Sequence, residues 1–325
     1  MRIPTINKEK TIARVKDASI LWILVAMCLI LTCLTDSFLT PLNVVTVLKQ
    51  ISILGIVAAG STFTIITGGI DMSCGSIMAL SGVCAAFVGQ ADSGLPLILA
   101  VLVAIAVGGL VGLLNGVGIS YGKIPPFIMT LGTMTSVRGF ALLLTDGMPI
   151  FNLQANFPEL VNYAVFNIGD VKVPVIIFFL IGIIALSSVL LNRTTFGKHV
   201  MALGGNAEAA RFSGVNVKLV RTIVYVYSGL LAGLAGVLMA ALINSGNATI
   251  ADSYAMDAIS ASVIGGVSMS GGIGTIWKTI VGALIIGVMQ NGLQILKVSS
   301  FIQTIVQGAI IVIAVYLDVR TSKKK

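Results

Sequence analysis

Charged side chains are scarce in this chain of 325 residues, in which 10% are charged and 57% are hydrophobic. Soluble domains carry roughly 25% charged residues, so the composition excludes an ordinary soluble protein. The mean hydropathy is +1.04, and the apolar residues form long runs between short polar segments. Because one spanning helix needs about 20 residues, the sequence predicts an all-α polytopic membrane protein with about ten transmembrane helices.

Histidine and cysteine are scarce too, with His 1 and Cys 4 in the whole chain. His199 stands alone in a basic loop, and the cysteines lie in or beside apolar runs, without the spacing of a disulfide framework or a metal site. The phosphate-binding sequence G-x-x-x-x-G-K-[ST] is absent. We therefore expect no metal and no cofactor in this chain, and any ATP and Mg²⁺ would be bound by a partner ATPase.

The net charge of +8 comes from three basic clusters: the N-terminal tail, the loop 192–221 and the C-terminus. An even number of predicted spans separates neighbouring clusters, so all three lie on one side of the membrane. Lys and Arg concentrate in short cytoplasmic segments, and we therefore place both termini and the central loop in the cytoplasm. Because apolar blocks separate the clusters, we expect no nucleic acid partner.

The predicted spans cover residues 20–38, 44–66, 74–90, 95–119, 126–145, 173–191, 222–243, 255–269, 275–296 and 300–318. The third and eighth are short, which is typical of broken or re-entrant helices. We accordingly divide the chain into a cytoplasmic tail, 1–19, one transmembrane domain, 20–319, and a cytoplasmic basic tail, 320–325. The external segment 146–172 is too small for a domain of its own.

One carboxylate, Asp71, stands in the stretch TGGIDMSCG between two apolar runs. A Gly-Gly pair allows a helix to break inside a membrane, and the freed backbone groups then need polar partners. Asp71 and Ser73 would serve as caps of the following helix. They would equally suit the border of a transport path, with Asp71 in a gate. The sequence leaves both interpretations open.

The chain also repeats itself. GGIDMSCG at 68–75 is echoed by GGVSMSGG at 265–272, and GGLVGLLNG at 108–116 is loosely echoed by GALIIGVMQNG at 282–292. Internal repeats with glycine-interrupted helices are common in transporters. The two echoes imply different span offsets, so parallel and inverted repeats both stay open. We predict a translocation path or gate that includes Gly68, Gly69, Asp71, Ser73, Gly265, Gly266, Ser268, Asn291 and Gln294.

Arg138 and Asp257 are further charges inside predicted spans. Because an unpaired charge is unfavourable in lipid, we predict intramembrane ion pairing for both. The expected partner of Arg138 is Asp71 or Asp257, unless its side chain reaches the membrane surface.

Amide side chains recur in the last two predicted spans. Gln290 and Gln294 are four residues apart, as are Gln303 and Gln307, so each pair shares one helix face. Such amides suit a neutral, hydroxyl-rich solute, and they equally suit hydrogen bonds between helices. The sequence does not decide between these interpretations.

The central loop contains GGNAEAARFSGVNV at 204–217, which predicts a short helix at about 207–213. Its start and end are marked by an N-cap Asn206, an early Glu208, a late Arg211 and a C-cap Gly214. A helix of this length is unstable alone. It must therefore dock, either on its own bundle or on a partner.

This loop closely resembles the coupling loop of sugar-type ABC permeases, the ribose/xylose/galactoside group. TGGIDMSCGS and DAISASVIGGVSMSGGIGTIWKTIVGALIIGVMQNG resemble the other hallmarks of that group. The resemblance extends over about residues 40–318 and is strongest to the ribose permeases. Met72, Cys74 and Lys278 depart from the usual pattern without touching a proposed role.

The resemblance implies the pore-forming subunit of an ATP-driven importer that carries a monosaccharide across the bacterial cytoplasmic membrane. It implies a second permease copy, with the sugar passing between the two, ATP-binding subunits on the cytoplasmic side and a soluble sugar-binding protein outside. The residues seated in the ATPase would then be Gly204, Gly205, Asn206, Glu208, Ala209, Ala210, Arg211 and Gly214.

Two other function classes compete with this interpretation. An ion- or proton-coupled secondary transporter would use Asp71, Asp257 and Arg138 for coupling, but it leaves the capped helix in the basic loop without a role. An intramembrane enzyme would need paired catalytic carboxylates, a Ser/His pair or a His-based metal site, and the sequence offers none. We therefore expect a transport subunit that is not itself an enzyme.

Overall fold

The computed structural model describes residues 8–169 and 171–322. The outermost parts of the two predicted tails, 1–7 and 323–325, lie outside the described residues. The long helices are α1 (Lys8–Leu34), α2 (Pro41–Ile66), α4 (Leu97–Ser120), α5 (Pro126–Thr145), α7 (Ile176–Arg193), α10 (Val217–Ile243), α12 (Ile276–Ile295) and α13 (Ser300–Ser322). The shorter ones are α3 (Cys74–Val88), a 3₁₀ turn (Ala91–Ser93), α6 (Glu159–Asn162), α8 (Thr195–Gly205), α9 (Ala207–Phe212) and α11 (Tyr254–Ile264).

Each predicted span coincides with one of these helices. Within the described residues, 6 helices are long and apolar enough to cross a membrane, and shorter apolar helices lie at Ile20–Leu34, Cys74–Val88, Tyr254–Ile264 and Ser300–Ile310. The predicted third and eighth spans are indeed short, with 15 residues in α3 and 11 in α11. The chain is therefore a helical multi-pass membrane protein, and the count of about ten spans stays a prediction.

Three parts of the chain differ from the predicted pattern. The helix α1 begins at Lys8, within the predicted tail 1–19, because Lys, Glu, Ala and Arg favour helix and continue the apolar span toward the N-terminus. The external segment carries α6 and an antiparallel hairpin of β1 (Ala164–Ile168) and β2 (Val171–Pro174). The central loop contains α8 in addition to the predicted short helix.

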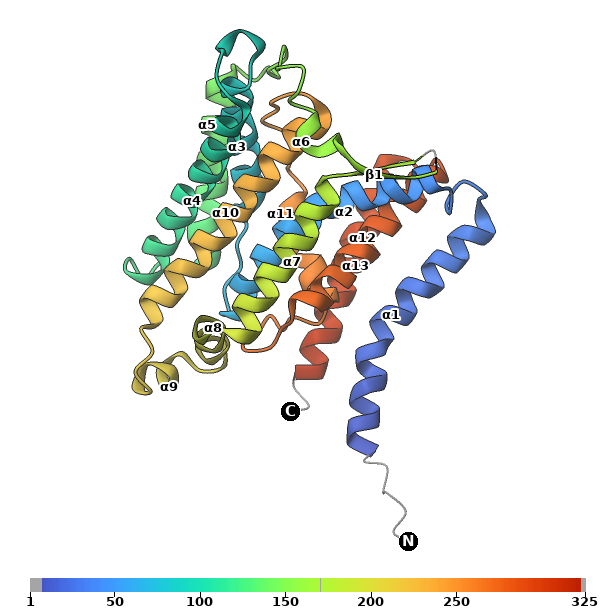
Figure 1. Ribbon diagram of the computed structural model, residues 1–325. Coiled ribbons are helices and arrows are strands. Elements are labelled where there is room, and N and C mark those ends of the chain that lie inside the picture. Colours follow the sequence, from blue (N-terminus) through green and yellow to red (C-terminus); the bar gives the residue numbers. More distant parts are fainter. Residues whose placement is uncertain (1–7, 170, 323–325) are drawn as a thin grey trace.

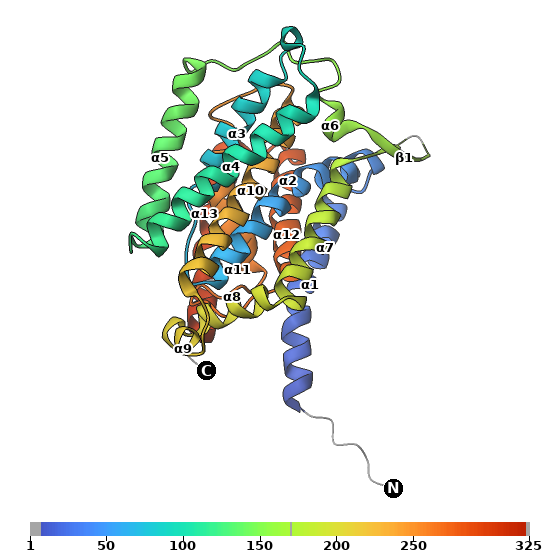
Figure 2. The same ribbon diagram turned by 60° about the vertical axis from the view of Figure 1, so that its left-hand side comes forward.

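The helix α2 forms the centre of the bundle. Every residue from 51 to 66 is buried, and α7, α10, α11 and α12 pack around it. A helix that is apolar on all sides is typical of such a central position. The helices α1 and α5 lie at the periphery in both views (Figures 1 and 2).

The helices α4 and α10 touch through their backbones. Gly108, Gly112 and Gly116 of α4 face α10, and a Cβ atom on Gly116 would lie 2.8 Å from the Thr222 backbone. Small residues at regular spacing allow this close approach between membrane helices. Across this contact the Thr222 hydroxyl of α10 donates a hydrogen bond of 3.2 Å to the Gly116 carbonyl oxygen of α4.

The two ends of the bundle carry different structures (Figure 1). The start of α1, the end of α13 and the helices α8 and α9 lie at one end. The hairpin, α6 and the loop after α10 lie at the other end. The arrangement separates the basic central loop from the predicted external segment.

Candidate functional site

Residues 67–73 form a sharp turn between α2 and α3 inside the bundle, called the α2–α3 turn below. The helix α2 ends at Ile66, and Gly68 then adopts a positive φ of +75°. The Gly69 N–H donates to the Thr64 carbonyl oxygen at 3.0 Å, which is the closing hydrogen bond of a Schellman motif. Gly69 lies directly against the Tyr225 hydroxyl, so a side chain there would displace it.

The second glycine motif ends α11 in the same way, although one residue later than the sequence match suggests. Gly266 has a φ of +84°, and the Val267 N–H donates to the Ser262 carbonyl oxygen at 3.0 Å. The structural counterpart of Gly68 is therefore Gly266, whereas the sequence aligns it with Gly265. Gly265 instead packs against the backbone of Lys278. The two motifs are therefore aligned by the glycine that has a positive φ in each, Gly68 and Gly266.

Asp71 lies at the centre of a buried hydrogen-bond network, with 1% of its surface exposed. Its carboxylate accepts hydrogen bonds from the Ser73 N–H at 3.0 Å, the Ser73 hydroxyl at 2.6 Å and the Ser228 hydroxyl at 3.0 Å. The Asn115 carboxamide donates to the Ser73 hydroxyl at 2.8 Å and accepts from the Thr133 hydroxyl at 2.6 Å. The network therefore joins the α2–α3 turn to α4, α5 and α10.

The predicted capping of α3 is right only in part. Asp71 accepts the amide of Ser73, which is the N-cap residue, but the Ser73 hydroxyl donates to Asp71 and caps no helix amide. Thr130 of α5 supports the same segment, since its hydroxyl donates to the Ile70 carbonyl and accepts from the Met72 N–H. The hydrogen bonds to Asp71 thus come from hydroxyl and amide groups, as a buried carboxylate requires.

The predicted ion pair of Arg138 has a different partner. Arg138 of α5 pairs with Asp252, in the loop before α11, and their side chains are 31% and 55% exposed. Asp257 instead accepts a hydrogen bond from Gln307 of α13. The predicted pairing with Asp71 or Asp257 is wrong, because Arg138 lies on the peripheral helix while both carboxylates face inward and are bound by neutral groups.

The short helix α9 forms as predicted, ending one residue earlier. The Asn206 side chain accepts the Ala209 N–H at 2.9 Å and is therefore its N-cap. At the other end Gly214 has a φ of +87°, and its N–H donates to the Arg211 carbonyl oxygen at 3.0 Å. The caps that the sequence indicated thus set both ends of the helix.

One face of α9 is buried and the other is free in this chain. Ala210 is buried, whereas Glu208, Ala209 and Arg211 are exposed. Phe212 is 81% exposed, and the Arg211 guanidinium lies 5.4 Å from its ring centroid. An aromatic and an arginine side by side on a small helix are typical of protein interfaces.

The end of α8 meets the end of α2. Gly204 packs so closely against the Ile66 carbonyl oxygen and the Gly272 amide that a Cβ atom would overlap both. The Gly272 N–H also donates to the Ile66 carbonyl oxygen at 2.8 Å. Gly205 lies beside Gly272, with its Cα 3.0 Å from the Cβ position of that residue. Three glycine motifs far apart in the sequence therefore meet at one point.

The remaining predicted path residues lie in different places. Asn291 of α12 exchanges two hydrogen bonds with Asn43 of α2, at 2.8 and 3.0 Å, so it joins helices. Ser268 is buried, and its hydroxyl accepts the Ser270 N–H within the second glycine loop. Gln294 lines a cavity of about 240 Å³ together with Gln290. Only part of the predicted set thus faces open space.

Several polar partners were not predicted. Asn115 could have been noticed in the sequence, because it is a carboxamide in α4, the most apolar of the long described helices, whose mean hydropathy is 2.9. Ser228, Thr133 and Asn43 are ordinary polar residues of their helices and become partners only through the packing. Sequence spacing alone does not find them.

Comparison with known proteins gives the family. The branched-chain amino acid transport system / permease component family matches residues 43–315. The chain belongs to this permease family. The ribose import permease protein of Bacillus subtilis (strain 168) is 44% identical to the permease over 299 residues, which are 91% of this chain and 90% of the relative.

Two further relatives cover nearly the whole permease. The ribose import permease protein of Escherichia coli (strain K12) is 39% identical over 309 residues, 93% of each chain. The galactose/methyl galactoside import permease protein of the same strain is 36% identical over 334 residues, 98% of this chain and 99% of the relative. No solved structure matches the permease significantly. The predicted resemblance to sugar permeases is confirmed.

Proposed function

We propose that the permease is the membrane-spanning subunit of an ATP-binding-cassette importer for a monosaccharide, with a ribose-like sugar as the first candidate. Its relatives over more than nine tenths of its length are named as import permeases for ribose and for galactose and methyl galactoside. The observation that carries the proposal is the capped, outward-facing helix α9, connected through Gly204 to the end of α2.

The orientation follows from the basic residues. Five basic residues lie in α8 and α9 or at the adjoining ends of α7 and α10, namely Arg193, Lys198, Arg211, Lys218 and Arg221. We infer that this end of the bundle faces the cytoplasm. The start of α1 and the end of α13 lie at the same end (Figure 1), so both termini are cytoplasmic and the chain crosses the bacterial cytoplasmic membrane about ten times.

Transport depends on movement of α9. A cytoplasmic ATP-binding subunit, which binds ATP and Mg²⁺, holds the exposed face formed by Glu208, Arg211 and Phe212. When it closes on ATP, α9 and α8 shift together. The contact of Gly204 with Ile66 is between backbones, and close-packed atoms transmit displacement with little compression. The end of α2 moves, and the Asp71 network keeps the α2–α3 turn attached to the neighbouring helices.

The assembly contains other partners. A sugar-binding protein outside the membrane delivers the solute, and a second permease copy completes the membrane part. The permease itself hydrolyses nothing. The competing secondary transporter would need a relay of charged groups, yet Asp71 is enclosed among hydroxyl groups and Arg138 pairs with an exposed carboxylate.

Co-purification with the ATP-binding subunit tests this function. Ala210→Pro breaks α9, because it removes the Ala210 N–H that donates to the Asn206 carbonyl oxygen at 2.9 Å and proline inside a helix costs about 3 kcal/mol. We expect loss of ATPase association and of uptake with normal membrane insertion. Asp92→Pro in the 3₁₀ turn at the opposite end is the control and should leave association intact. Normal association of the Ala210→Pro variant contradicts the assignment of α9.

A further inference from the structure

The carboxylate of Asp252 lies at mid-membrane depth. The helix α3 has 15 residues, a length of about 22 Å, and a bridge between Gln90 and Leu153 ties the chain after it to the external segment. Gly75 lies in the first turn of α3, at the opposite end, and a Cβ atom there would be 2.5 Å from the Ala251 carbonyl oxygen. Asp252 is the next residue. Because the hydrocarbon layer is about 30 Å thick, this position is near its middle.

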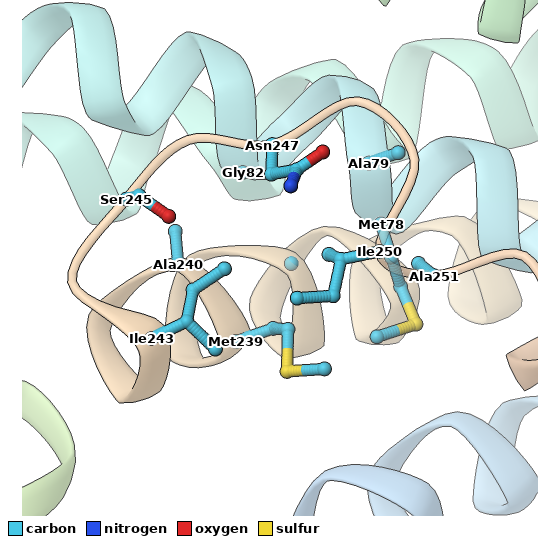
Figure 3. A pocket seen from close by; sticks show the side chains of 11 residues that line it. Met78, Ala79, Gly82, Met239, Ala240, Ile243, Ser245, Asn247, Ile250 and Ala251 are labelled. Carbon is cyan, nitrogen blue, oxygen red and sulfur yellow. The ribbon is translucent and has the colours of Figure 1, made fainter. Parts of the chain in front are cut away.

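The loop between α10 and α11 is packed closely enough to fix this depth. Near the external segment, the Gly246 and Ile150 backbones exchange hydrogen bonds of 2.8 and 3.0 Å. Further along the loop, Ile250 and Ala251 lie against α3 and line a hollow together with Met78 (Figure 3). The volume of this hollow is about 10 Å³, barely that of one water molecule. The carboxylate that follows the loop is therefore held in place.

Arg138 reaches the same depth from α5. It precedes Thr145, at the external end of α5, by seven residues, which is about 10 Å. Helix side chains point toward the N-terminus, so the guanidinium extends further inward, to its partner Asp252. The two side chains remain 31% and 55% exposed. Charged groups at this depth occur where they face protein or a water-filled space, so lipid does not cover the pair.

The side of α5 that points away from the bundle carries small residues. Gly132, Thr135, Ser136 and Gly139 are exposed, and their spacing places them on one side of the helix, next to Arg138. We call these four residues the α5 stripe. A Cβ atom on either glycine would have no atom within 4 Å, so no described part of the chain packs there. Small residues at this spacing allow membrane helices to approach closely.

The outward face of α7 has a different composition. Figure 2 shows α5 and α7 on opposite sides of the bundle. The exposed side chains of α7 include Ile181, Leu186 and Val189, and the helix contains no charged residue before Arg193 at its end. Large aliphatic side chains without charge suit contact with lipid. The two faces therefore require different surroundings.

The face around the α5 stripe is complementary to a copy of itself. Most homo-oligomers have two-fold symmetry, in which the same surface of each copy meets the other. Such a surface must match itself in charge and in shape. Arg138 and Asp252 place a positive and a negative group side by side, and the α5 stripe offers a shallow surface to a second helix of the same kind. Water between the two copies would solvate the exposed parts of both ion pairs.

We propose that a second copy of the permease covers the outward face of α5, and that the two Arg138–Asp252 pairs line the water-filled sugar passage between the copies. The proposal rests on the proposed function and adds the face by which the copies meet. Guanidinium groups donate hydrogen bonds and carboxylates accept them, so both groups of the pair suit sugar hydroxyls. Each copy supplies one half of this passage, and a single chain leaves it open to lipid.

Cross-linking between copies tests the face. The full transporter, with its ATP-binding subunit, is placed in lipid nanodiscs after the four native cysteines of the permease are replaced by alanine, and co-purification of the ATP-binding subunit verifies assembly. With a short bismaleimide, Ser136→Cys in the α5 stripe should convert most of the permease into a covalent dimer. Leu186→Cys, about 15 Å from the external end of α7, is the matched control and should stay monomeric. A dimer from Leu186→Cys, or none from Ser136→Cys, overturns the proposal.

Thiol labelling tests for water at the ion pair. Met256 is 46% exposed and lies one helical turn beyond Asp252. In the same cysteine-free background and with and without ATP, Met256→Cys should react with a charged, water-soluble thiol reagent, because the reactive thiolate is disfavoured in apolar surroundings. Leu186→Cys, which faces lipid, should stay unlabelled. An unreactive Met256→Cys thiol would mean that lipid or packed protein surrounds the pair, and the passage would be wrong.

Uptake separates the inference from the proposed function. In vesicles with the sugar-binding protein and ATP, labelled Met256→Cys should lose uptake of labelled ribose, and Leu186→Cys treated in the same way should keep it. Undiminished uptake by labelled Met256→Cys shows that the pair does not line the passage. If the unchanged complex transports neither ribose nor another monosaccharide, the proposed function itself fails, whatever the cross-linking shows.

Discussion

The Gly272 N–H donates a hydrogen bond of 2.8 Å to the Ile66 carbonyl oxygen, and Gly204 packs against both groups. The relationship joins the loop before α12 to the end of α2 and places the end of α8 on that joint. Because backbone atoms make all these contacts, the joint has no flexible side chain that could absorb a movement. It joins α8, the helix that precedes α9, to the interior of the bundle.

Gly204→Ala should disturb this joint. The added Cβ overlaps the Ile66 carbonyl oxygen and the Gly272 amide, and such overpacking typically costs 1–3 kcal/mol, so we expect about that loss of stability. Thermal unfolding of the purified permease measures it, and uptake per ATP hydrolysed measures the accompanying loss of coupling.

Gly182→Ala on α7 is the matched control, since a Cβ there has no atom within 4 Å. It should unfold at the temperature of the unchanged protein or slightly above it. If the two variants had the same stability and the same uptake per ATP hydrolysed, the Gly204 contact would not transmit movement from α8 to α2.

Asp71→Ala should destabilise the permease by about 1–3 kcal/mol, because the Ser73 and Ser228 donors lose a buried acceptor. Asp71→Asn keeps an acceptor oxygen and should lose less. Thermal or denaturant unfolding in detergent gives both values.

Asp92→Ala provides the comparison for Asp71. Asp92 is exposed and makes one long hydrogen bond, 3.4 Å from Asn152, so its loss should stay within about 0.5 kcal/mol. Similar stabilities for Asp71→Ala and Asp92→Ala would mean that the Asp71 network does not stabilise the α2–α3 turn.

Charge exchange tests the ion pair that replaced the predicted one. Arg138→Asp combined with Asp252→Arg should recover what either single change loses, and for an exposed pair the coupling free energy is about 1 kcal/mol or less. A double-mutant cycle on unfolding free energies measures it.

The alternative exchange, Arg138→Asp with Asp257→Arg, is the control. It should recover nothing, because Asp257 binds Gln307 and the new arginine would be buried without a partner. Recovery by this second exchange and not by the first would restore the originally predicted pair.

Features with local causes could be predicted from the sequence. The bounds of α5 agree with the prediction because Pro126 starts the helix and Asp146 ends it in the left-handed conformation. The helix α9 was predicted because Asn206 and Gly214 are caps whose effect spans a few residues. The apolar runs gave the other spans for the same reason, since burial in lipid depends on composition over one helix length.

Features that depend on packing could not be predicted. The partner of Arg138 depends on which side of α5 faces the bundle, and the sequence of α5 does not decide it. The structural counterpart of Gly68 is identified by the positive φ of Gly266. Alignment of the two sequence motifs pairs Gly68 with Gly265 instead, one residue too early. The cavity joins Gln50 of α2 to Gln290 of α12, and their proximity follows only from the folded bundle.

Uphill transport by the permease alone tests the central claim most directly. Vesicles that contain only this chain are given labelled ribose with a proton or sodium gradient, and parallel vesicles contain the ATP-binding subunit, the sugar-binding protein and ATP. We expect accumulation above the external concentration only in the second set. Accumulation by the permease alone, driven by the ion gradient, would contradict an ATP-driven importer subunit moved through α9.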